Sequence, residues 1–204
     1  MPHAFFIWDI VGVFVFAVSG ALAARQKHMD PWGMFILAII TGTGGGTLRS
    51  LLIGDLPPAF LRHPGYLASA TAGVLLTLLV PHAVRRLEKP ILVIDAMGLG
   101  VYVCLGTIVS LEKGLAPWAA LAMGVVTAVF GGVLRDVFRA EVPLIFKREI
   151  YATAALIGGM LFLALRHVGV PQTLSIGLTT AATLAIRLLA IRYRINMRDR
   201  AGST

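Results

Sequence analysis

Apolar residues along the chain gather in long runs, which short polar segments rich in glycine and proline separate. A helix needs about 20 mostly apolar residues to cross the hydrocarbon core of a membrane. Seven runs approach this length, and they cover residues 5–24, 32–53, 65–82, 91–110, 117–139, 150–167 and 172–191. The pattern therefore predicts an all-α membrane protein with seven transmembrane helices.

The composition excludes other broad classes of protein. Apolar residues make up 57% of the 204 residues and charged residues only 14%, whereas soluble domains carry about 25% charge. The mean hydropathy of +0.84 also excludes an intrinsically disordered chain.

The distribution of basic residues predicts the orientation in the membrane. The first nine residues contain Asp9 and no lysine or arginine, so the first run does not have the pattern of a signal peptide. With the N-terminus outside, the inner loops and the tail hold roughly thirteen basic residues and the outer loops roughly four. We therefore expect the C-terminus inside.

Because the net charge of +8 lies beside apolar runs, we expect anionic lipids at the basic loops and tail, and no nucleic acid.

An internal repeat divides the chain. A shift of 86 residues places Asp9 on Asp95 and Arg49 on Arg135, with about fifteen identities over about 54 positions. Each copy holds three runs, so the second copy enters the membrane from the opposite side. We expect a first three-helix repeat over residues 1–90, an inverted repeat over 91–170, and a seventh helix with a basic tail over 171–204.

Glycine clusters interrupt the second and fifth runs. They are Gly44, Gly45 and Gly46 in the first copy, and Gly131 and Gly132 in the second. Glycine costs about 1 kcal/mol in a helix interior, so these clusters are expected to unwind or kink their helices. Backbone freed in this way is tolerated in a membrane where it lines water, which favours a polar path with one constriction per repeat. Close packing of helices through small residues is the alternative.

Charged residues within the runs are the second candidate for a path. Asp9, Asp95, Arg49 and Arg135 recur as matched pairs, and an unpaired charge in the membrane costs roughly 3 kcal/mol or more. We expect each arginine to pair with a carboxylate, from Asp9, Asp95 or Asp136, as a salt-bridged gate or clamp. In the alternative interpretation, Asp9 and Arg49 reach the membrane surface.

The sequence gives no sign of catalytic or metal chemistry. The five histidines lie at loops or run ends, and nucleophile or metal-binding motifs are missing, so neither enzyme activity, a metal site nor a cofactor is expected. Inverted repeats of this kind are typical of proteins that move solutes. A duplicated structural bundle without a path is the alternative.

The doubled glycine–arginine pattern resembles that of a known family of membrane proteins. Residues 44–49 (GGGTLR), 131–136 (GGVLRD) and 143–151 (PLIFKREIY) resemble the trimeric intracellular cation (TRIC) channels in their prokaryotic branch. The resemblance runs from about Phe5 to Arg192 and implies a protein of a bacterial or archaeal plasma membrane.

The resemblance also implies a function. It implies a homotrimer in which each protomer has its own pore near the second and fifth helices and conducts potassium and sodium. The acidic residue that usually follows the first arginine is Ser50 here, so Arg49 is expected to use Asp95 or another group, or to be freer to move. Some bacterial relatives look like transporters of glycine or similar solutes, so a carrier is the alternative to a channel.

Overall fold

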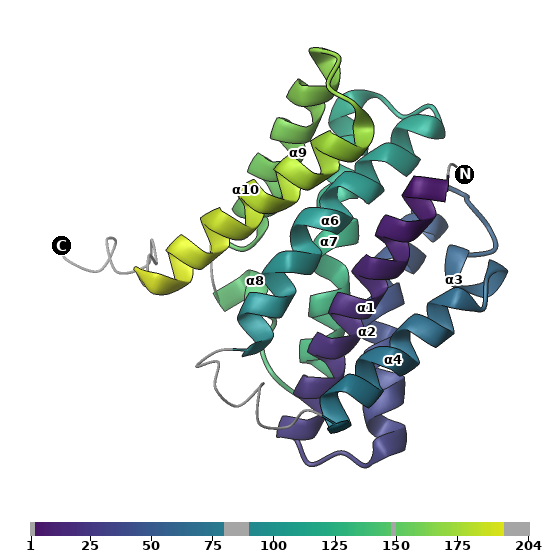
Figure 1. The fold of residues 1–204 in the computed structure, drawn as a ribbon, viewed down its shortest axis with the longest axis vertical. Helices are drawn as coiled ribbons and strands as arrows, with labels where there is room; N and C mark the ends of the chain where they lie inside the picture. The colour runs from purple at the N-terminus through teal and green to yellow at the C-terminus, as the bar shows by residue number, and fades with distance from the viewer. Residues whose placement is uncertain (1–2, 80–89, 148–149, 194–204) are drawn as a thin grey trace.

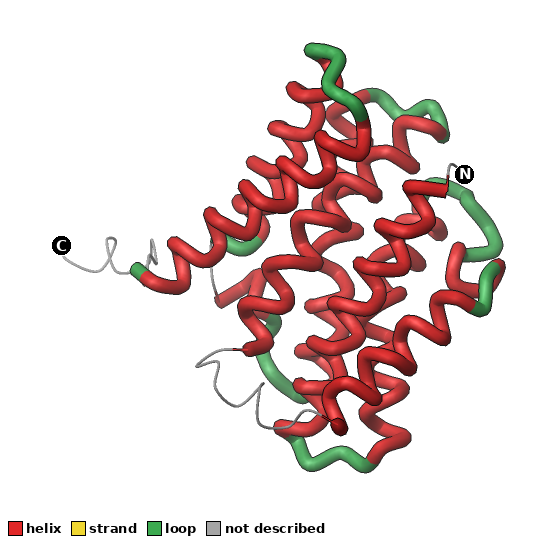
Figure 2. The backbone as a smooth tube through the Cα atoms, viewed as in Figure 1, coloured by secondary structure: helices red, strands yellow, loops and turns green. Residues whose placement is uncertain are grey.

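The fold is entirely helical in the part of the chain that the computed structural model describes, which is residues 3–79, 90–147 and 150–193 (Figure 2). The helices in chain order are α1 (His3–Gln26), α2 (Pro31–Leu52), α3 (Ala59–Arg62), α4 (Gly65–Leu79), α6 (Pro90–Glu112), α7 (Pro117–Phe138), α8 (Leu144–Lys147), α9 (Ala152–His167) and α10 (Gln172–Arg192) (Figure 1). Each of the seven predicted runs coincides, to within a few residues, with one of the longer helices. The end of the third run, residues 80–82, lies outside the described residues.

Five of these helices are long and apolar enough to cross a membrane. They are α1, α2, α6, α7 and α10, whereas α4 and α9 are shorter apolar helices. The prediction of an all-helical membrane protein is therefore confirmed. Proline in the first turn of α2 and α7 suits a helix start, because the N–H that proline lacks has no partner there in any case.

The longer helices alternate in direction, so that α1 and α6 run antiparallel through the middle of the bundle (Figure 1). Helix α1 packs against α2, α4 and α6, and α6 packs against α7, α9 and α10. The two helices contain most of the fully buried apolar residues. They form the frame against which the second helix of each repeat is held.

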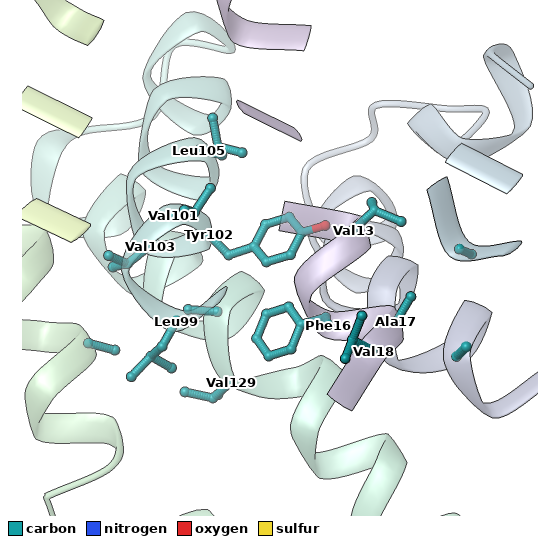
Figure 3. Packing of buried hydrophobic residues seen from close by; sticks show 14 of the residues in the cluster. Val13, Phe16, Ala17, Val18, Leu99, Val101, Tyr102, Val103, Leu105 and Val129 are labelled. Carbon is teal, nitrogen blue, oxygen red and sulfur yellow. The ribbon is translucent and has the colours of Figure 1, made fainter. Parts of the chain in front are cut away.

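An aromatic pair joins α1 to α6 at the centre of the core (Figure 3). The rings of Phe16 and Tyr102 stack with centroids 5.2 Å apart and planes at 14°. Glycine makes room for each ring on the opposite helix, since a Cβ on Gly98 would lie 2.9 Å from Phe16 and one on Gly12 would lie 3.1 Å from Tyr102. Residues at matching positions of the two repeats thus contact one another.

The glycine clusters do not unwind their helices. Helix α2 continues through Gly44–Gly46 and α7 continues through Gly131 and Gly132. The expected unwinding is therefore wrong for both helices, whereas a kink at the glycines stays a prediction. Unwound backbone would lose its hydrogen bonds in a low-dielectric bundle, and the helices instead use these glycines to approach each other.

The approach of α2 to α7 is close and reciprocal. A Cβ on Gly45 would lie 2.0 Å from the carbonyl oxygen of Thr127, and a Cβ on Gly131 would lie 2.3 Å from the carbonyl oxygen of Thr41. Both threonine hydroxyls donate to carbonyls of the preceding turn of their own helices, at 2.6 Å, so they add no unpaired polar group to this contact. The packing alternative for the glycine clusters is thus observed at Gly45 and Gly131.

Ion pairs tie the two repeats together at both ends of the bundle. Asp55, after α2, contacts Lys113 at 2.8 Å and Arg62 at 3.1 Å. Glu141, after α7, contacts Lys27 at 3.1 Å. Each acidic residue follows the glycine-rich helix of one repeat, and each lysine ends the first helix of the other.

The close contact at Gly45 predicts the effect of a single methyl group. Gly45→Ala would force the backbones of α2 and α7 apart, so we expect it to lower the free energy of unfolding by about 1–3 kcal/mol. Gly46→Ala is the matched control, because its Cβ would meet nothing nearer than the Arg49 guanidinium at 3.9 Å. Thermal unfolding in detergent measures both. Equal stability of the two variants would contradict this account of the contact.

The ion pairs of Asp55 predict a dependence of stability on pH. Lys113, and then Arg62, hold the pKa of the Asp55 carboxyl below its usual range. A lowered folded-state pKa stabilises the fold above the ordinary value of about 3.9, and this contribution is lost as the pH falls through the folded-state pKa. We expect Asp55→Asn to cost at most about 1 kcal/mol at pH 7, because Lys113 is partly exposed.

The measurement compares melting temperatures of wild type and Asp55→Asn from pH 7 to pH 3. The difference between them is expected to shrink from about pH 5 downward. Glu141→Gln is the matched variant at the other end, since Lys27 and Arg139 also lower the pKa of Glu141. A difference for Asp55→Asn that stays constant with pH would refute the electrostatic origin.

Candidate functional site

The residues predicted for a path divide into three groups in space. Gly44, Gly45 and Gly131 lie in the contact between α2 and α7, where a Cβ on Gly44 would also meet the Leu134 side chain. The remaining residues form two matched sites, one in each repeat. We call them the Asp9 site (Asp9, Gly46, Arg49 and Tyr66) and the Asp95 site (Asp95, Gly132, Arg135 and Asp136).

The Asp95 site is a closed ion cluster. The Arg135 Nη1 donates to the Asp95 Oδ1 at 2.5 Å and its Nε donates to the Asp136 Oδ1 at 2.9 Å. The side chains of Asp95 and Arg135 are both fully buried. Arg135 therefore has the carboxylate partners that the sequence led us to expect.

Neighbouring helices complete the Asp95 site. The Arg135 Nη1 also donates to the Ser19 hydroxyl of α1 at 2.7 Å. The Asp136 Oδ2 accepts from the backbone N–H of Leu144 at 3.0 Å, which fixes the start of α8. A Cβ on Gly132 would lie 2.8 Å from the Tyr151 hydroxyl and 3.3 Å from the Asp95 Oδ1, so only glycine fits beneath the ion pair.

The Asp9 site has the same aspartate, glycine and arginine in a different arrangement. The Asp9 Oδ2 accepts a hydrogen bond of 2.6 Å from the Tyr66 hydroxyl, which comes from α4. Arg49 is 3% exposed and forms no ion pair with any described residue, and its Nε donates no hydrogen bond. The expectation that each arginine pairs with a carboxylate is therefore wrong for Arg49.

The neighbours of Arg49 explain the missing ion pair. Ser50 stands where the second repeat has Asp136. Asp95, named above as a possible partner, is held by Arg135 instead. The remaining carboxylate of the site, Asp9, is buried within the bundle and held by Tyr66. The alternative interpretation, in which Asp9 and Arg49 lie near the membrane surface, stays a prediction.

A small cavity with polar and apolar walls has both Asp9 and Arg49 in its lining. Its volume is about 20 Å³, which is room for one water molecule or one small ion. The lining residues include the following: Asp9, Gly42, Thr43, Gly46, Thr47, Arg49, Tyr66 and Tyr102. The Tyr102 hydroxyl donates to the Gly42 carbonyl oxygen at 2.9 Å, so α6 closes the side of the cavity that faces the second repeat.

Several residues of the two sites were not predicted from the sequence. Tyr66 and Tyr151 occupy similar places beside Asp9 and Asp95, but their spacing is one residue short of the 86-residue repeat, so an ungapped comparison does not pair them. Ser19 belongs to none of the motifs or repeat matches found in the sequence, so it was not predicted. Arg187 on α10 lies over the Tyr151 ring, with its Cζ 4.9 Å from the ring centroid, and its position in the last run was the only indication of a role.

An apolar groove opens beside the glycine contact. Its volume is about 300 Å³, and its walls include Ile39, Leu48, Phe130 and Leu134 from α2 and α7. The described residues contain no group of three or more His, Cys, Asp or Glu side chains placed to hold a metal ion. The polar chemistry predicted for the glycine-rich helices is thus concentrated in the two aspartate–arginine sites.

Comparison with known proteins supports the same fold over nearly the whole chain. The UPF0126 inner membrane protein YadS of Escherichia coli (strain K12) is 40% identical over 196 residues, which cover 93% of this chain and 92% of YadS. The TRIC channel orthologue of Rhodobacter sphaeroides is 37% identical, with a TM-score of 0.87 over 94% of this chain and 98% of that one. Another structure, described as a TRIC cation channel, is 33% identical, with a TM-score of 0.81 over 96% of each chain.

These relatives establish the class and location of the protein. They are inner membrane proteins and ion channels rather than enzymes, and the chain is an integral protein of the plasma membrane. A family model described as glycine transporter matches residues 6–82 and 92–167. The chain therefore belongs to this glycine transporter family, and its fold is that of the TRIC channels that its glycine–arginine motifs resemble.

Proposed function

We propose that the protein is a channel for monovalent cations, potassium and sodium, with one pathway in each protomer. The observation that carries this proposal is the match of nearly the whole chain to TRIC cation channel structures, at a TM-score of up to 0.87. The pathway runs beside the glycine-rich helices α2 and α7, from the Asp9 site to the Asp95 site. Gly44, Gly45 and Gly131 hold the two helices at the crossing between these sites.

The chemistry of the Asp9 site favours a cation over an anion at the start of the pathway. Beside Arg49, the residues that line its cavity include Asp9, Tyr66, Thr43 and Thr47, whose side chains all carry oxygen. Oxygen ligands of this kind replace part of the hydration shell of a small cation. Arg49 and the Arg135 ion cluster act as gates in this proposal, because a guanidinium repels a cation unless a carboxylate neutralises it.

We propose a membrane topology of seven spans with the N-terminus outside and the C-terminus inside, and an inverted repeat of residues 1–90 and 91–170 followed by residues 171–204. Three observations support the repeat. The family model matches two stretches whose starts, residues 6 and 92, are separated by the 86-residue repeat. Phe16 stacks on its counterpart Tyr102. The glycine contacts and the terminal ion pairs are reciprocal, as a two-fold axis requires.

We also propose that the protein is a homotrimer that binds anionic lipids at its basic loops and tail. Its solved relatives are named trimeric channels. The apolar groove between α2 and α7 offers a surface for a neighbouring protomer or a lipid chain. Most of the basic tail lies outside the described residues, so its lipid contacts are proposed from the charge of the sequence alone.

A carrier for a small neutral solute such as glycine is the second candidate function. The description of the family model favours it, and so does the presence of a buried carboxylate and a buried guanidinium on the same cavity, which suits a molecule with both charges. The cavity of about 20 Å³ is smaller than such a solute needs, so this function requires the site to widen.

Current measurements distinguish the two functions. The purified protein is reconstituted in a planar bilayer with a gradient of potassium chloride, and with potassium gluconate to provide a larger anion. We expect single-channel steps and a reversal potential near the potassium equilibrium value. Saturable glycine uptake into vesicles without current steps would overturn the channel in favour of the carrier, and the absence of both fluxes would overturn both.

A further inference from the structure

The two aspartate–arginine sites are equivalent in sequence but differ in state. In each repeat an arginine follows the aspartate by 40 residues and lies beside a glycine of the same helix, Gly46 or Gly132. In the Asp95 site the guanidinium contacts the carboxylate, at 2.5 Å. In the Asp9 site the two groups form no ion pair and line a cavity between them.

The guanidinium of the Asp95 site occupies the place that a free cation would take. Its Nη1 binds the Asp95 Oδ1 and the Ser19 hydroxyl, which are both oxygen ligands. A mobile ion that reached Asp95 would have to displace this group. Asp136 holds the guanidinium from the other side through Nε, so two carboxylates keep it in place.

The Asp9 site lacks the second of these restraints. Ser50 replaces the aspartate, so no carboxylate of α2 holds the guanidinium of Arg49. Arg49 is nevertheless buried and its Nε has no acceptor among the described residues. A buried guanidinium that contacts no carboxylate is unfavourable, so a move onto Asp9 would stabilise it, and a cation on Asp9 would oppose that move.

We propose that Asp9 is a binding site for one monovalent cation, and that Arg49 is a tethered competitor which takes the place of that ion when the site is empty. This inference rests on the proposed function and explains how a pathway with two arginines admits cations. The two arrangements correspond to the two positions of such a competitor, since Arg49 lies across a cavity from Asp9 whereas Arg135 contacts Asp95. Passage through the second site then requires Arg135 to leave Asp95.

The charge of the Asp9 site favours a monovalent over a divalent ion. Calcium takes six to eight oxygen ligands, usually with several carboxylates, whereas Asp9 is the one carboxylate on the cavity. With Arg49 withdrawn but still nearby, an ion of charge +1 is the largest charge that a single carboxylate neutralises. The site is therefore expected to bind potassium and sodium weakly and to exchange them readily.

Thiol modification tests the proposal without measuring current. Ala59 lines the cavity, is partly exposed and offers no side-chain oxygen to the ion, and the native Cys104 is fully buried, so Ala59→Cys supplies an accessible thiol at the site. The rate of reaction with a cationic methanethiosulfonate reagent is measured in detergent at increasing potassium, with N-methyl-D-glucamine keeping the ionic strength constant. Potassium bound at Asp9 is expected to slow the reaction.

Neutral and charged variants of Arg49 separate competition from simple packing. In the Ala59→Cys chain, Arg49→Gln is expected to lower the potassium concentration for half-protection at least threefold, because the competitor is gone. Arg49→Lys keeps a positive charge and is expected to stay closer to wild type. Arg49→Met keeps the stem without the charge and replaces Arg49→Gln if that variant does not elute as a folded protein.

Asp9→Asn is the matched loss of the carboxylate, since an asparagine oxygen still accepts from Tyr66. It is expected to abolish protection by potassium in both the Arg49 and the Arg49→Gln backgrounds. The inference would be overturned if half-protection needed the same potassium concentration with Arg49 as with its neutral variants. It would also be overturned if potassium still protected the thiol in the Asp9→Asn variant. If the protein conducts cations but either of these results is found, the proposed channel holds and the Asp9 ion site does not. If potassium protects the thiol through Asp9 but the protein carries no current, the ion site holds and the proposed channel is overturned.

Discussion

The cost of burying charge inside a membrane bundle is the constraint on which the arrangement of this protein depends. Arg135 meets it with two carboxylates, because Asp95 and Asp136 contact the guanidinium from two sides and Ser19 adds a neutral acceptor, although its Nη2 has no acceptor among the described residues. Removing the partners of one charge in such a cluster leaves that charge buried and unpaired, which lowers the free energy of unfolding by several kcal/mol. Four helices are tied to this cluster, since α6, α7 and α1 supply its polar groups and Asp136 fixes the start of α8.

The same constraint gives meaning to a single difference between the repeats. Reciprocal contacts at Phe16 and Tyr102, and at the glycines of α2 and α7, give both halves a common framework. Within it, serine at position 50 removes one of the two carboxylates that restrain the arginine. One site is consequently a closed ion cluster and the other contains a cavity. In the proposed pathway, the two sites are built from matching residues and differ in whether the arginine contacts its aspartate.

Much of this arrangement follows from the sequence, and the remainder depends on packing in three dimensions. Hydropathy located every long helix, and the chemistry of buried charge identified the partners of Arg135. The glycine clusters were interpreted as breaks because the helix propensity of glycine is local, whereas the close contact of Gly45 with Thr127 depends on a distant helix. Tyr66, which donates to the Asp9 carboxylate, one of the candidate partners of the arginines, lies one residue out of the repeat register and therefore had no counterpart in the comparison.

The coupling energy between each aspartate and its arginine tests the central claim most directly. Double-mutant cycles with Asp95→Asn and Arg135→Gln, and with Asp9→Asn and Arg49→Gln, are measured by unfolding in detergent without added potassium or sodium and again at high potassium. Two sites in different states predict a coupling of about 1.5 kcal/mol or more for Asp95 and Arg135 under both conditions. For Asp9 and Arg49 they predict a smaller coupling that falls below about 0.5 kcal/mol when potassium occupies the site. Equal couplings at the two sites, unaffected by potassium, would contradict the account.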